Sequence, residues 1–179
     1  MQMKDAAVVR VFFALWPQAS VQQALHAQAM EYQAQCAARV MRADTLHMTL
    51  LFLGEIERAQ LPQIMQNAGK LTMSAFEITL DKLAFWPHHR IAYATSQVEI
   101  MALDQLVMAL RQALAAAGYA LESREFVPHV TLLRHIGKNL GAQVIPPILW
   151  RVDSFVLVAS VSTGQGVGYQ MLAQWPLLP

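Results

Sequence analysis

The 179-residue sequence has little charge of either sign, and this scarcity limits what the protein can bind. Charged residues make up 14% of the chain, and 13 Lys and Arg against 12 Asp and Glu leave a net charge of +1. A protein that holds a long duplex needs a basic stripe, so that class is disfavoured, whereas a site for one phosphate needs only two or three cations. The hydrophobic fraction of 55% excludes a disordered chain and indicates a well-filled core.

Cysteine and long hydrophobic runs are also nearly absent. The single Cys36 allows no internal disulfide and excludes cysteine-rich zinc modules, which agrees with a reducing, cytoplasmic location. No apolar run approaches the roughly 20 residues of a membrane span, and residues 152–161 are interrupted by Asp153 and Ser154. The N-terminal residues lack the apolar core of a targeting segment. We expect one domain over residues 1–179, a monomer in the cytoplasm with no membrane partner.

Hydrophobic patterning predicts a mixture of strands and helices. Runs of β-branched and aromatic residues predict strands, and leucines three and four apart predict the clearest helix, which Gly118 ends. Gly54 is expected to close the second strand, and a turn at 86–90 joins the third strand to the fourth. The predicted strands are residues 8–15, 45–53, 76–85, 91–96, 130–133, 151–161 and 168–174, and the predicted helices are residues 18 to about 39, 57–71 and 99–117.

One six-residue segment occurs twice, once in each half of the chain. Residues 46–51 (LHMTLL) align with residues 128–133 (PHVTLL), and His129 follows His47 by 82 positions (129 − 47). A shuffled chain of this composition would hold two such copies in well under about 1 in 1,000 cases. One copy per half indicates a duplicated unit with two similar lobes that face each other.

The spacing within each copy predicts a polar strand face. Residues i and i+2 of a strand share a face and lie about 6.6 Å apart, so His47 points with Thr49, and His129 points with Thr131. The residues between them are apolar and should face the core. A single pair of this kind is usually structural, but two symmetric pairs favour one central site with two imidazoles and two hydroxyls.

This set of groups fits displacement at phosphorus. Imidazole titrates near neutral pH, so one ring can accept a proton while the other donates one on the opposite side of a reacting centre. The threonine hydroxyls can hold anionic oxygens without adding charge. The sequence has no G-x-S-x-G motif for a nucleophile, and Cys36 lies in a predicted helix. Hydrolysis of a cyclic phosphodiester is the simplest such reaction, and the near symmetry of the motifs leaves the two proton-transfer roles unassigned.

The two His-x-Thr motifs resemble the signature of the 2H phosphoesterase superfamily. Within it, the chain resembles the bacterial and archaeal RNA 2′,3′-cyclic phosphodiesterases, historically called 2′–5′ RNA ligases. The likeness covers nearly the whole chain and includes residues 10–14 (RVFFA), both motifs with Arg134 after the second, and the tail residues Phe155, Ser160, Tyr169 and Trp175. The resemblance implies an α+β, bilobal, duplicated fold with two antiparallel sheets facing a central cleft and helices on the outside.

The same resemblance implies an activity and a role for each site residue. The activity is hydrolysis of a 2′,3′-cyclic phosphate at an RNA end to a 2′-phosphomonoester, without metal or cofactor, and with weak 2′–5′ RNA ligation as its reverse. His47 would be the proton donor and His129 the proton acceptor. The phosphate would be bound by Thr49, Thr131 and Arg134.

Several other residues are candidates for the site or its surroundings. In regular strand alternation Arg134 would face away from His129, so a bend or bulge after Leu133 is required. His88 and His89 are adjacent and favour a polar turn rather than a metal site. The other candidate cations are Arg10, Arg42 and Arg90, and the aromatic candidates for stacking on a terminal base are Phe13, Phe52, Trp86 and Phe126.

Three alternatives stay open on the sequence alone. A related enzyme would act on a small cyclic nucleotide, an ADP-ribose cyclic phosphate or a 2′–5′ oligonucleotide. A non-catalytic module that binds RNA ends would need the threonines and Arg134 but not both histidines, and a purely structural domain would need the histidines only for stability. The low charge favours an RNA 3′ end or a small nucleotide with a 2′,3′-cyclic phosphate as partner over an extended RNA track.

Overall fold

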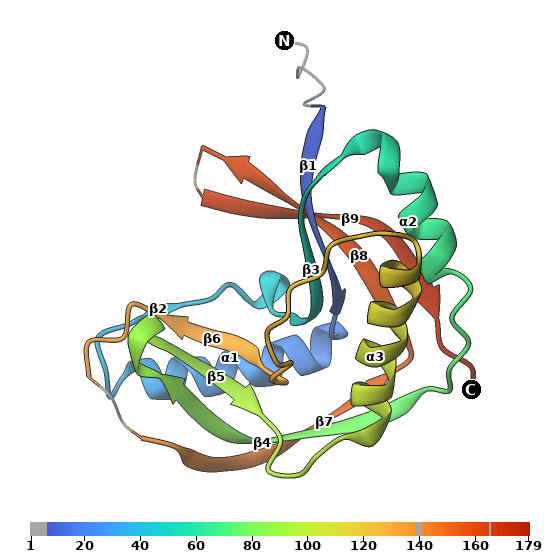
Figure 1. The fold of residues 1–179 in the computed structure, drawn as a ribbon. Coiled ribbons are helices and arrows are strands. Elements are labelled where there is room, and N and C mark those ends of the chain that lie inside the picture. Colours follow the sequence, from blue (N-terminus) through green and yellow to red (C-terminus); the bar gives the residue numbers. More distant parts are fainter. Residues whose placement is uncertain (1–6, 139–140, 165) are drawn as a thin grey trace.

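The computed structural model describes residues 7–138, 141–164 and 166–179 and has an α+β fold (Figure 1). The predicted class is confirmed, and most predicted elements exist with shifted ends. The strands in these residues are β1 Val8–Leu15, β2 Arg39–Val40, β3 Met48–Glu57, β4 Phe76–Trp86, β5 Ile91–Thr95, β6 Val130–Arg134, β7 Gln143–Val152, β8 Ser154–Thr163 and β9 Gly166–Pro176. The α-helices in them are α1 Ala19–Gln33, α2 Leu61–Ala68 and α3 Met101–Ala116.

The strands form two antiparallel groups that meet at one residue pair. The order across the described strands is β7-β4-β5-β6-β3-β1-β8-β9, and β2 pairs with β6. The pairing of β3 with β6 consists of Met48 opposite Val130. The sheet therefore divides into a β7-β4-β5-β6 half and a β3-β1-β8-β9 half. The described strands thus form one continuous sheet in place of the two predicted sheets, and a single residue pair connects its two halves.

The helices α1 and α3 each cross to the other half of the sheet: each packs against the half opposite the strand that precedes it in the chain. α1 follows β1 but packs against β2, β6 and β7, in the lower part of Figure 1. α3 follows β5 but packs against β3 and α2, on the other half. Apart from the short β2 between α1 and β3, the order strand–helix–strand is the same in β1-α1-β3 and β5-α3-β6, as a duplicated unit requires. This exchange of helices holds the two halves together.

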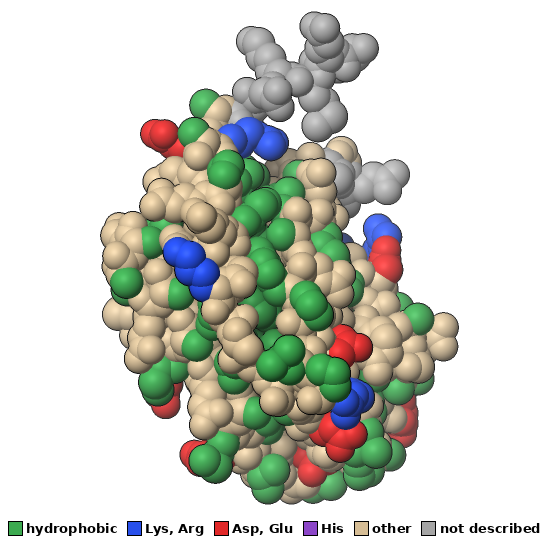
Figure 2. Space-filling view, turned by 90° about the vertical axis from the view of Figure 1, so that its right-hand side faces the viewer, with side chains coloured by type: hydrophobic (Ala, Val, Ile, Leu, Met, Phe, Trp, Pro, Cys, Tyr) green, Lys and Arg blue, Asp and Glu red, His purple; other side chains and the backbone are tan. Residues whose placement is uncertain are grey.

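The larger of two hydrophobic clusters among the described residues extends through both halves. It includes Trp150 of β7, one of the largest fully buried side chains. The buried helix positions recur every three or four residues and include Val21, Leu25, Ala29 and Tyr32 in α1, and Leu103, Leu106, Leu110 and Leu114 in α3. Apolar groups also reach the exterior. Figure 2 shows hydrophobic side chains spread over one face among few charged groups, which agrees with the low charged fraction.

The sequence pattern does not predict β7 or the short β2. The prediction of one strand over residues 151–161 is wrong, because Asp153 separates β7 from β8. Pro146 and Pro147 obscure the strand pattern of β7, since proline donates no hydrogen bond to a ladder. The prolines are tolerated because β7 lies at an edge of the described sheet, and its register with β4 shifts where they occur.

Gly54 does not end the second strand as predicted, and β3 continues through it to Glu57. Gly54 has a φ of +74°, in the left-handed region that is strained for residues with a side chain. The register with β1 shifts beside it, so that Leu53 is an extra residue. A bulge with glycine at positive φ bends a strand without ending it. β3 is thereby long enough to pair with the whole of β1.

The helices are shorter than predicted. α2 begins only after a 3-10 turn over residues 58–60, where Glu57 and Gln60 form a capping box, and Pro62 lies in its first turn. α1 ends at Gln33, so Cys36 lies in the turn beyond it, buried as a free thiol. Within the described ranges, no helix is both long and apolar enough to cross a membrane.

Replacing Gly54 with alanine is expected to lower the free energy of unfolding by about 1–2 kcal/mol. The cause is backbone strain alone, because no atom lies within 4 Å of the added Cβ. Gly164→Ala is the matched control, since its Cβ would also meet open space but its φ is not positive. We expect the control to change stability by less than about 0.5 kcal/mol. Urea unfolding followed by circular dichroism measures both variants, and equal effects would contradict the role of the Gly54 backbone.

Candidate active site

The junction of the two halves brings the two His-x-Thr motifs together. Met48 and Val130, the middle residues of the motifs, pair across the junction, and both side chains are completely buried. Successive side chains of a strand point to opposite faces, so the histidine and threonine of each motif extend away from the core. All four polar side chains line one cleft of about 690 Å³.

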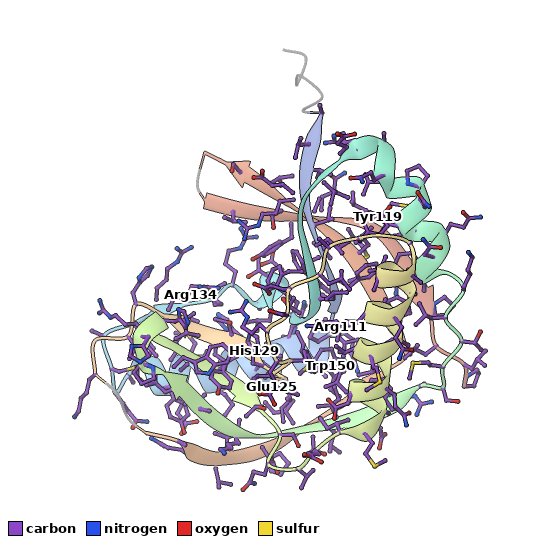
Figure 3. The ribbon with its side chains drawn as sticks, in the orientation of Figure 1. Arg111, Tyr119, Glu125, His129, Arg134 and Trp150 are labelled. Carbon is purple, nitrogen blue, oxygen red and sulfur yellow. The ribbon has the colours of Figure 1, made fainter. Side chains whose placement is uncertain are left out.

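The cleft has the size of a nucleotide site and is bordered by both halves of the sheet. Its walls come mainly from β1, β3, β8 and β9 on one side and from β6 on the other, and Figure 3 shows His129 and Arg134 near the two ends of β6. The further polar residues that line it are Arg10, Thr45, Glu55, Arg58, Arg134, Ser160 and Ser162. The apolar and aromatic ones include Phe12, Met41, Phe52, Val167 and Tyr169.

A bulge in β6 turns Arg134 into the cleft. The register of β6 with β5 shifts between Thr131 and Leu133, so that Leu132 is an extra residue. Leu132 and Leu133 are both buried, and Arg134 returns to the cleft face. The predicted need for a bulge is confirmed, but the bulge lies before Leu133 rather than after it.

The first motif contains the equivalent bulge. The register of β3 with β1 shifts between Thr49 and Leu51, so that Leu50 is an extra residue. Phe52 then has the place in the first motif that Arg134 has in the second, and it also lines the cleft. The repeat is therefore symmetric in its backbone but differs at these two side chains, one aromatic and one cationic.

Backbone carbonyls hold both imidazole rings in the same way. Nδ1 of His47 lies 2.7 Å from the carbonyl oxygen of Thr45, and Nδ1 of His129 lies 2.7 Å from that of Val127. A carbonyl oxygen can only accept a hydrogen bond, so Nδ1 carries the proton in each neutral ring. Nε2 of each ring is therefore the atom left to exchange protons.

Known proteins match this chain in sequence and in fold. Residues 15–93 match a family model described as LigT like Phosphoesterase. The RNA 2′,3′-cyclic phosphodiesterase of Escherichia coli strain K12 is 33% identical over 173 residues, which cover 94% of this chain and 96% of that protein. The chain belongs to the LigT-like 2H phosphoesterase family. The resemblance inferred from the two motifs is confirmed, and the protein is a phosphoesterase, a hydrolase.

Other relatives of this phosphoesterase also match over nearly the full length. A Thermus thermophilus protein named RNA 2′,3′-cyclic phosphodiesterase is 27% identical over 188 residues, covering 94% of this chain and 90% of that protein. The crystal structure of E. coli LigT in apo form has a TM-score of 0.83 at 30% identity and covers 97% of this chain and 100% of that one. E. coli LigT complexed with 3′-AMP has a TM-score of 0.81 at 30% identity, covering 95% and 98%.

Aromatic rings pack around both histidines of the phosphoesterase, a feature that the sequence does not predict. Trp16 stacks on His47 with ring centroids 5.1 Å apart, and Tyr169 contacts the same ring edge-on at 5.0 Å. Trp86, expected as a base-stacking candidate, packs against His129 at 4.6 Å. These residues come from different strands and turns, so no spacing in the sequence links them to the motifs. The rings restrict how each imidazole can turn.

Burial and nearby positive charge favour the neutral form of both histidines. Burial lowers the pKa of His47 from 6.5 to about 4, against the effect of its carbonyl hydrogen bond. The charges of His129 and Arg134 make a smaller contribution to the same lowering. Burial also lowers the pKa of His129, again against its carbonyl hydrogen bond, and Arg124 and Arg134 add to the effect. An anion bound beside these groups would offset the positive charge and raise both pKa values.

The other candidate cations lie in different surroundings. Arg10 lines the cleft, as Arg134 does. Arg42 forms an exposed ion pair with Asp44. Arg90 donates hydrogen bonds to backbone carbonyls just beyond β6. Only the first of these three therefore faces the cleft.

The remaining aromatic and histidine candidates are also distributed. Phe52 lines the cleft, whereas Phe13 is completely buried and Phe126 packs against the core. His88 and His89 lie in a 3-10 turn, which agrees with the predicted turn at 86–90. Among the residues that the structure describes, no three or more His, Cys, Asp or Glu side chains gather into a group able to hold a metal ion.

Acid is expected to destabilise the fold through His47. Its pKa is about 4 in the folded protein against 6.5 for an ordinary histidine, so between these values the unfolded chain binds a proton that the folded chain does not. The free energy of unfolding should therefore fall as the pH drops from about 6.5 to 4. The contribution of this partly exposed ring is on the order of 2 kcal/mol. Urea unfolding of the wild type and His47→Asn across this range measures it.

His26→Asn, a change on α1 outside the cleft, is the control for this experiment and should keep the wild-type dependence. Carboxylates titrate in the same range in all three proteins, so their contributions cancel in the differences. Parallel pH curves for the wild type and His47→Asn would contradict the lowered pKa.

Proposed function

We propose that this phosphoesterase hydrolyses RNA 2′,3′-cyclic phosphate ends to 2′-phosphomonoesters, with its two histidines as general acid and general base. The observation that carries the proposal is the matched pair of imidazoles, each held at Nδ1 by a carbonyl and each bordering the same cleft. The relatives named RNA 2′,3′-cyclic phosphodiesterase support the substrate class. Acid, base and positive charge all come from side chains, so the proposed reaction needs no metal or cofactor.

The proposed reaction is an in-line displacement at phosphorus. A water molecule attacks phosphorus while its proton passes to Nε2 of His129, and the bond from phosphorus to ribose O3′ breaks. Nε2–H of His47 protonates the departing O3′, which leaves a 3′-hydroxyl and a 2′-phosphomonoester. His129 ends protonated and His47 neutral, and proton exchange with solvent restores both. The two histidines come from the two strands joined by the Met48–Val130 pair, which suits attacking and leaving oxygens on opposite sides of phosphorus.

Thr49, Thr131 and Arg134 would hold the oxygens of the phosphate. All three line the cleft; the hydroxyls donate hydrogen bonds without adding charge, and the guanidinium offsets the negative charge. The bound anion would in turn raise the depressed pKa of His47. His47 would thus gain its proton as substrate binds. An imidazolium made strongly acidic by burial is well suited to protonate a basic ribose oxygen.

Phe52 is our candidate for contact with the terminal base. Its side chain is 38% exposed and lines the cleft. It packs against Phe12 at 5.6 Å, and Phe12 in turn contacts His47 at 5.2 Å. Stacking on an aromatic ring tolerates any base, which suits an enzyme that acts on varied RNA ends. The crystal structure of E. coli LigT with 3′-AMP supports nucleotide binding in this family.

The same groups also suit some related reactions. An RNA 5′-hydroxyl in place of the water would give 2′–5′ RNA ligation. Small cyclic nucleotides, ADP-ribose cyclic phosphate and 2′–5′ oligonucleotides are alternative substrates and belong beside RNA in any assay. Action as a monomer stays a prediction. A cytoplasmic location stays a prediction from the cysteine content.

Removing either histidine is expected to abolish most of the activity. A short RNA with a 2′,3′-cyclic phosphate end is incubated with the protein in chelator and followed by phosphorus NMR. The wild type should form a 2′-phosphate, and His47→Ala and His129→Ala should each react about 100-fold more slowly or worse, because each lacks one proton-transfer group. His26→Ala, outside the cleft, should react at the wild-type rate. An intact ring with the wild type, or a 3′-phosphate product, would refute the proposal.

A second substrate distinguishes the proton donor from the acceptor in the same assay. Sulfur in place of O3′ gives a leaving group that needs little help from an acid. With this phosphorothiolate, His47→Ala should recover most of its lost rate, and His129→Ala should not. The opposite pattern would exchange the two histidine roles but leave the proposed reaction intact.

Substitution of Phe52 should weaken substrate binding more than the chemical step. Base stacking contributes about 1–3 kcal/mol, so Phe52→Ala should raise KM by roughly 5- to 100-fold and change kcat little. Phe52→Tyr keeps a stacking face and should stay near the wild type. Steady-state kinetics on RNA and on an abasic ribose 2′,3′-cyclic phosphate measure the effect. Equal losses on both substrates would show that Phe52 does not act through the base.

A further inference from the structure

Arg90 makes its contacts beside the cleft rather than in it. It lies between the 3-10 turn Pro87–His89 and β5. Its Nε donates to the carbonyl oxygen of Ile136 at 2.9 Å, and its Nη2 donates to that of His135 at 3.4 Å. His135 and Ile136 are the two residues that follow Arg134. The guanidinium of Arg90 therefore binds the chain directly after the cleft-facing arginine.

The main chain beside Arg90 completes this contact. The amide nitrogen of Ile136 donates to the carbonyl oxygen of Arg90 at 3.2 Å, so Arg90 both donates to and accepts from the same residue. The next residue, Ile91, lies opposite Arg134 in the pairing of β5 with β6. Two consecutive residues therefore hold the chain around Arg134: Ile91 pairs with it in the sheet, and the Arg90 side chain binds the two residues after it.

Both ends of the clamp have a strained backbone. Arg90 has a φ of 51° and His135 a φ of 59°, in the left-handed region that few residues with a side chain adopt. Such conformations persist where their surroundings determine them, and they gather at functional sites. His135 turns the chain directly after Arg134, and Ile136 then enters the core. The hydrogen bonds of Arg90 stabilise this turn.

We propose that Arg90 is a positioning residue for Arg134. By holding the carbonyls of His135 and Ile136, it keeps the Arg134 guanidinium directed at the phosphate site. This inference rests on the proposed function, in which Arg134 binds the phosphate. A guanidinium suits the task because its rigid fork donates to two neighbouring acceptors in fixed geometry, which a lysine ammonium does not. A misplacement of about 1 Å can slow an enzyme by roughly 100-fold.

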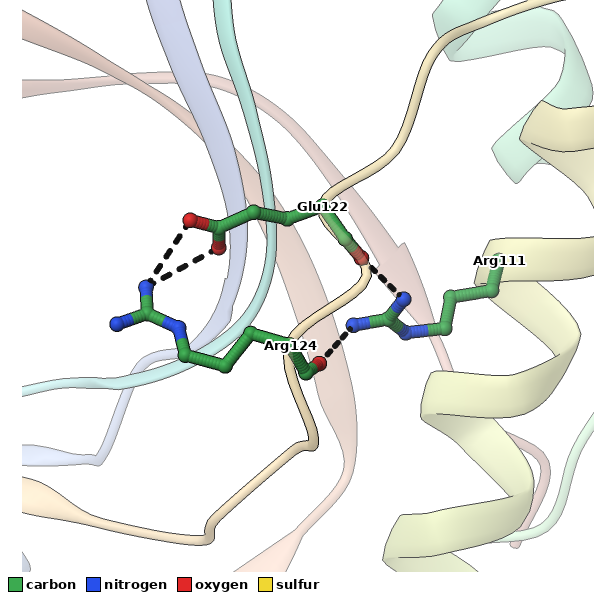
Figure 4. Close-up of polar contacts among 3 residues, drawn as sticks. All are labelled: Arg111, Glu122 and Arg124. Carbon is green, nitrogen blue, oxygen red and sulfur yellow. Dashed lines mark hydrogen bonds and ion pairs between the residues drawn. The ribbon is translucent and has the colours of Figure 1, made fainter.

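Arg111 offers a matched control because it makes a similar clamp elsewhere. Its Nη1 and Nη2 donate to the carbonyl oxygens of Glu122 and Arg124 at 2.7 and 3.0 Å, in the loop between α3 and β6 (Figure 4). Glu122 and Arg124 also form an ion pair with each other. Arg111→Ala therefore loosens a loop without removing any contact to the residues beside Arg134.

The test is a double-mutant cycle on hydrolysis of an RNA 2′,3′-cyclic phosphate. Arg134→Ala is expected to lower kcat/KM by about 100-fold, Arg90→Ala by about 10-fold, and Arg90→Lys by less. If Arg90 acts through Arg134, the variant with both alanines loses no more than Arg134→Ala alone. The losses of Arg111→Ala and Arg134→Ala should instead multiply. Thermal unfolding verifies that each variant is folded.

If the double variant loses kcat/KM by the product of the losses of Arg90→Ala and Arg134→Ala, the proposal is overturned and Arg90 is a structural clamp only. Full activity of Arg134→Ala would remove the phosphate-binding role of Arg134, and the positioning role with it. The single variant Arg134→Ala reveals this second outcome by itself, so it is distinguished from the first outcome, which requires the Arg90 variants. If Arg90→Ala fails to fold, Arg90→Lys replaces it in the same cycle.

Discussion

The candidate active site depends on a single strand contact, the pairing of Met48 with Val130. The other neighbouring strands described share two or more residue pairs, so the sheet has its fewest residue pairs where the two His-x-Thr motifs lie. The buried side chains of this pair anchor the junction in the core, and the polar residues on either side must then share one cleft. Few strand hydrogen bonds join the two halves at this pair. The packing of α1 and α3, each against the half opposite its preceding strand, adds contacts that hold the halves together.

The duplication sets out two equivalent half-sites, and two side chains make them different. Equivalent bulges at Leu50 and Leu132 turn the residues two positions further on into the cleft. In the first half that residue is Phe52, and in the second it is Arg134. An aromatic face on one side and a cation on the other can orient a nucleotide, because a base stacks on an aromatic ring and a phosphate pairs with a cation. The two half-sites therefore differ in side chains although their backbones are equivalent.

The electrostatics of the cleft favour an anionic ligand. The two imidazoles are partly buried and close to Arg134, and both factors disfavour their charged forms. The carbonyl hydrogen bonds oppose the effect and set the tautomer. An anion relieves the repulsion and shifts a proton onto a ring. The arrival of a phosphate would therefore prepare the acid that the proposed reaction requires.

The sequence by itself determined the motifs, their strand faces and the α+β class, because strand alternation and apolar periodicity are local properties. It also indicated that Arg134 needs a bulge. Only the tertiary structure decided where that bulge lies, that Trp16 and Tyr169 pack on His47, and that Arg90 holds the turn after β6. The sequence pattern does not predict the edge strand β7, because its two prolines argue against a strand. They are tolerated only because β7 lies at an edge of the sheet. These features arise between segments far apart in the chain, where local pattern carries no information.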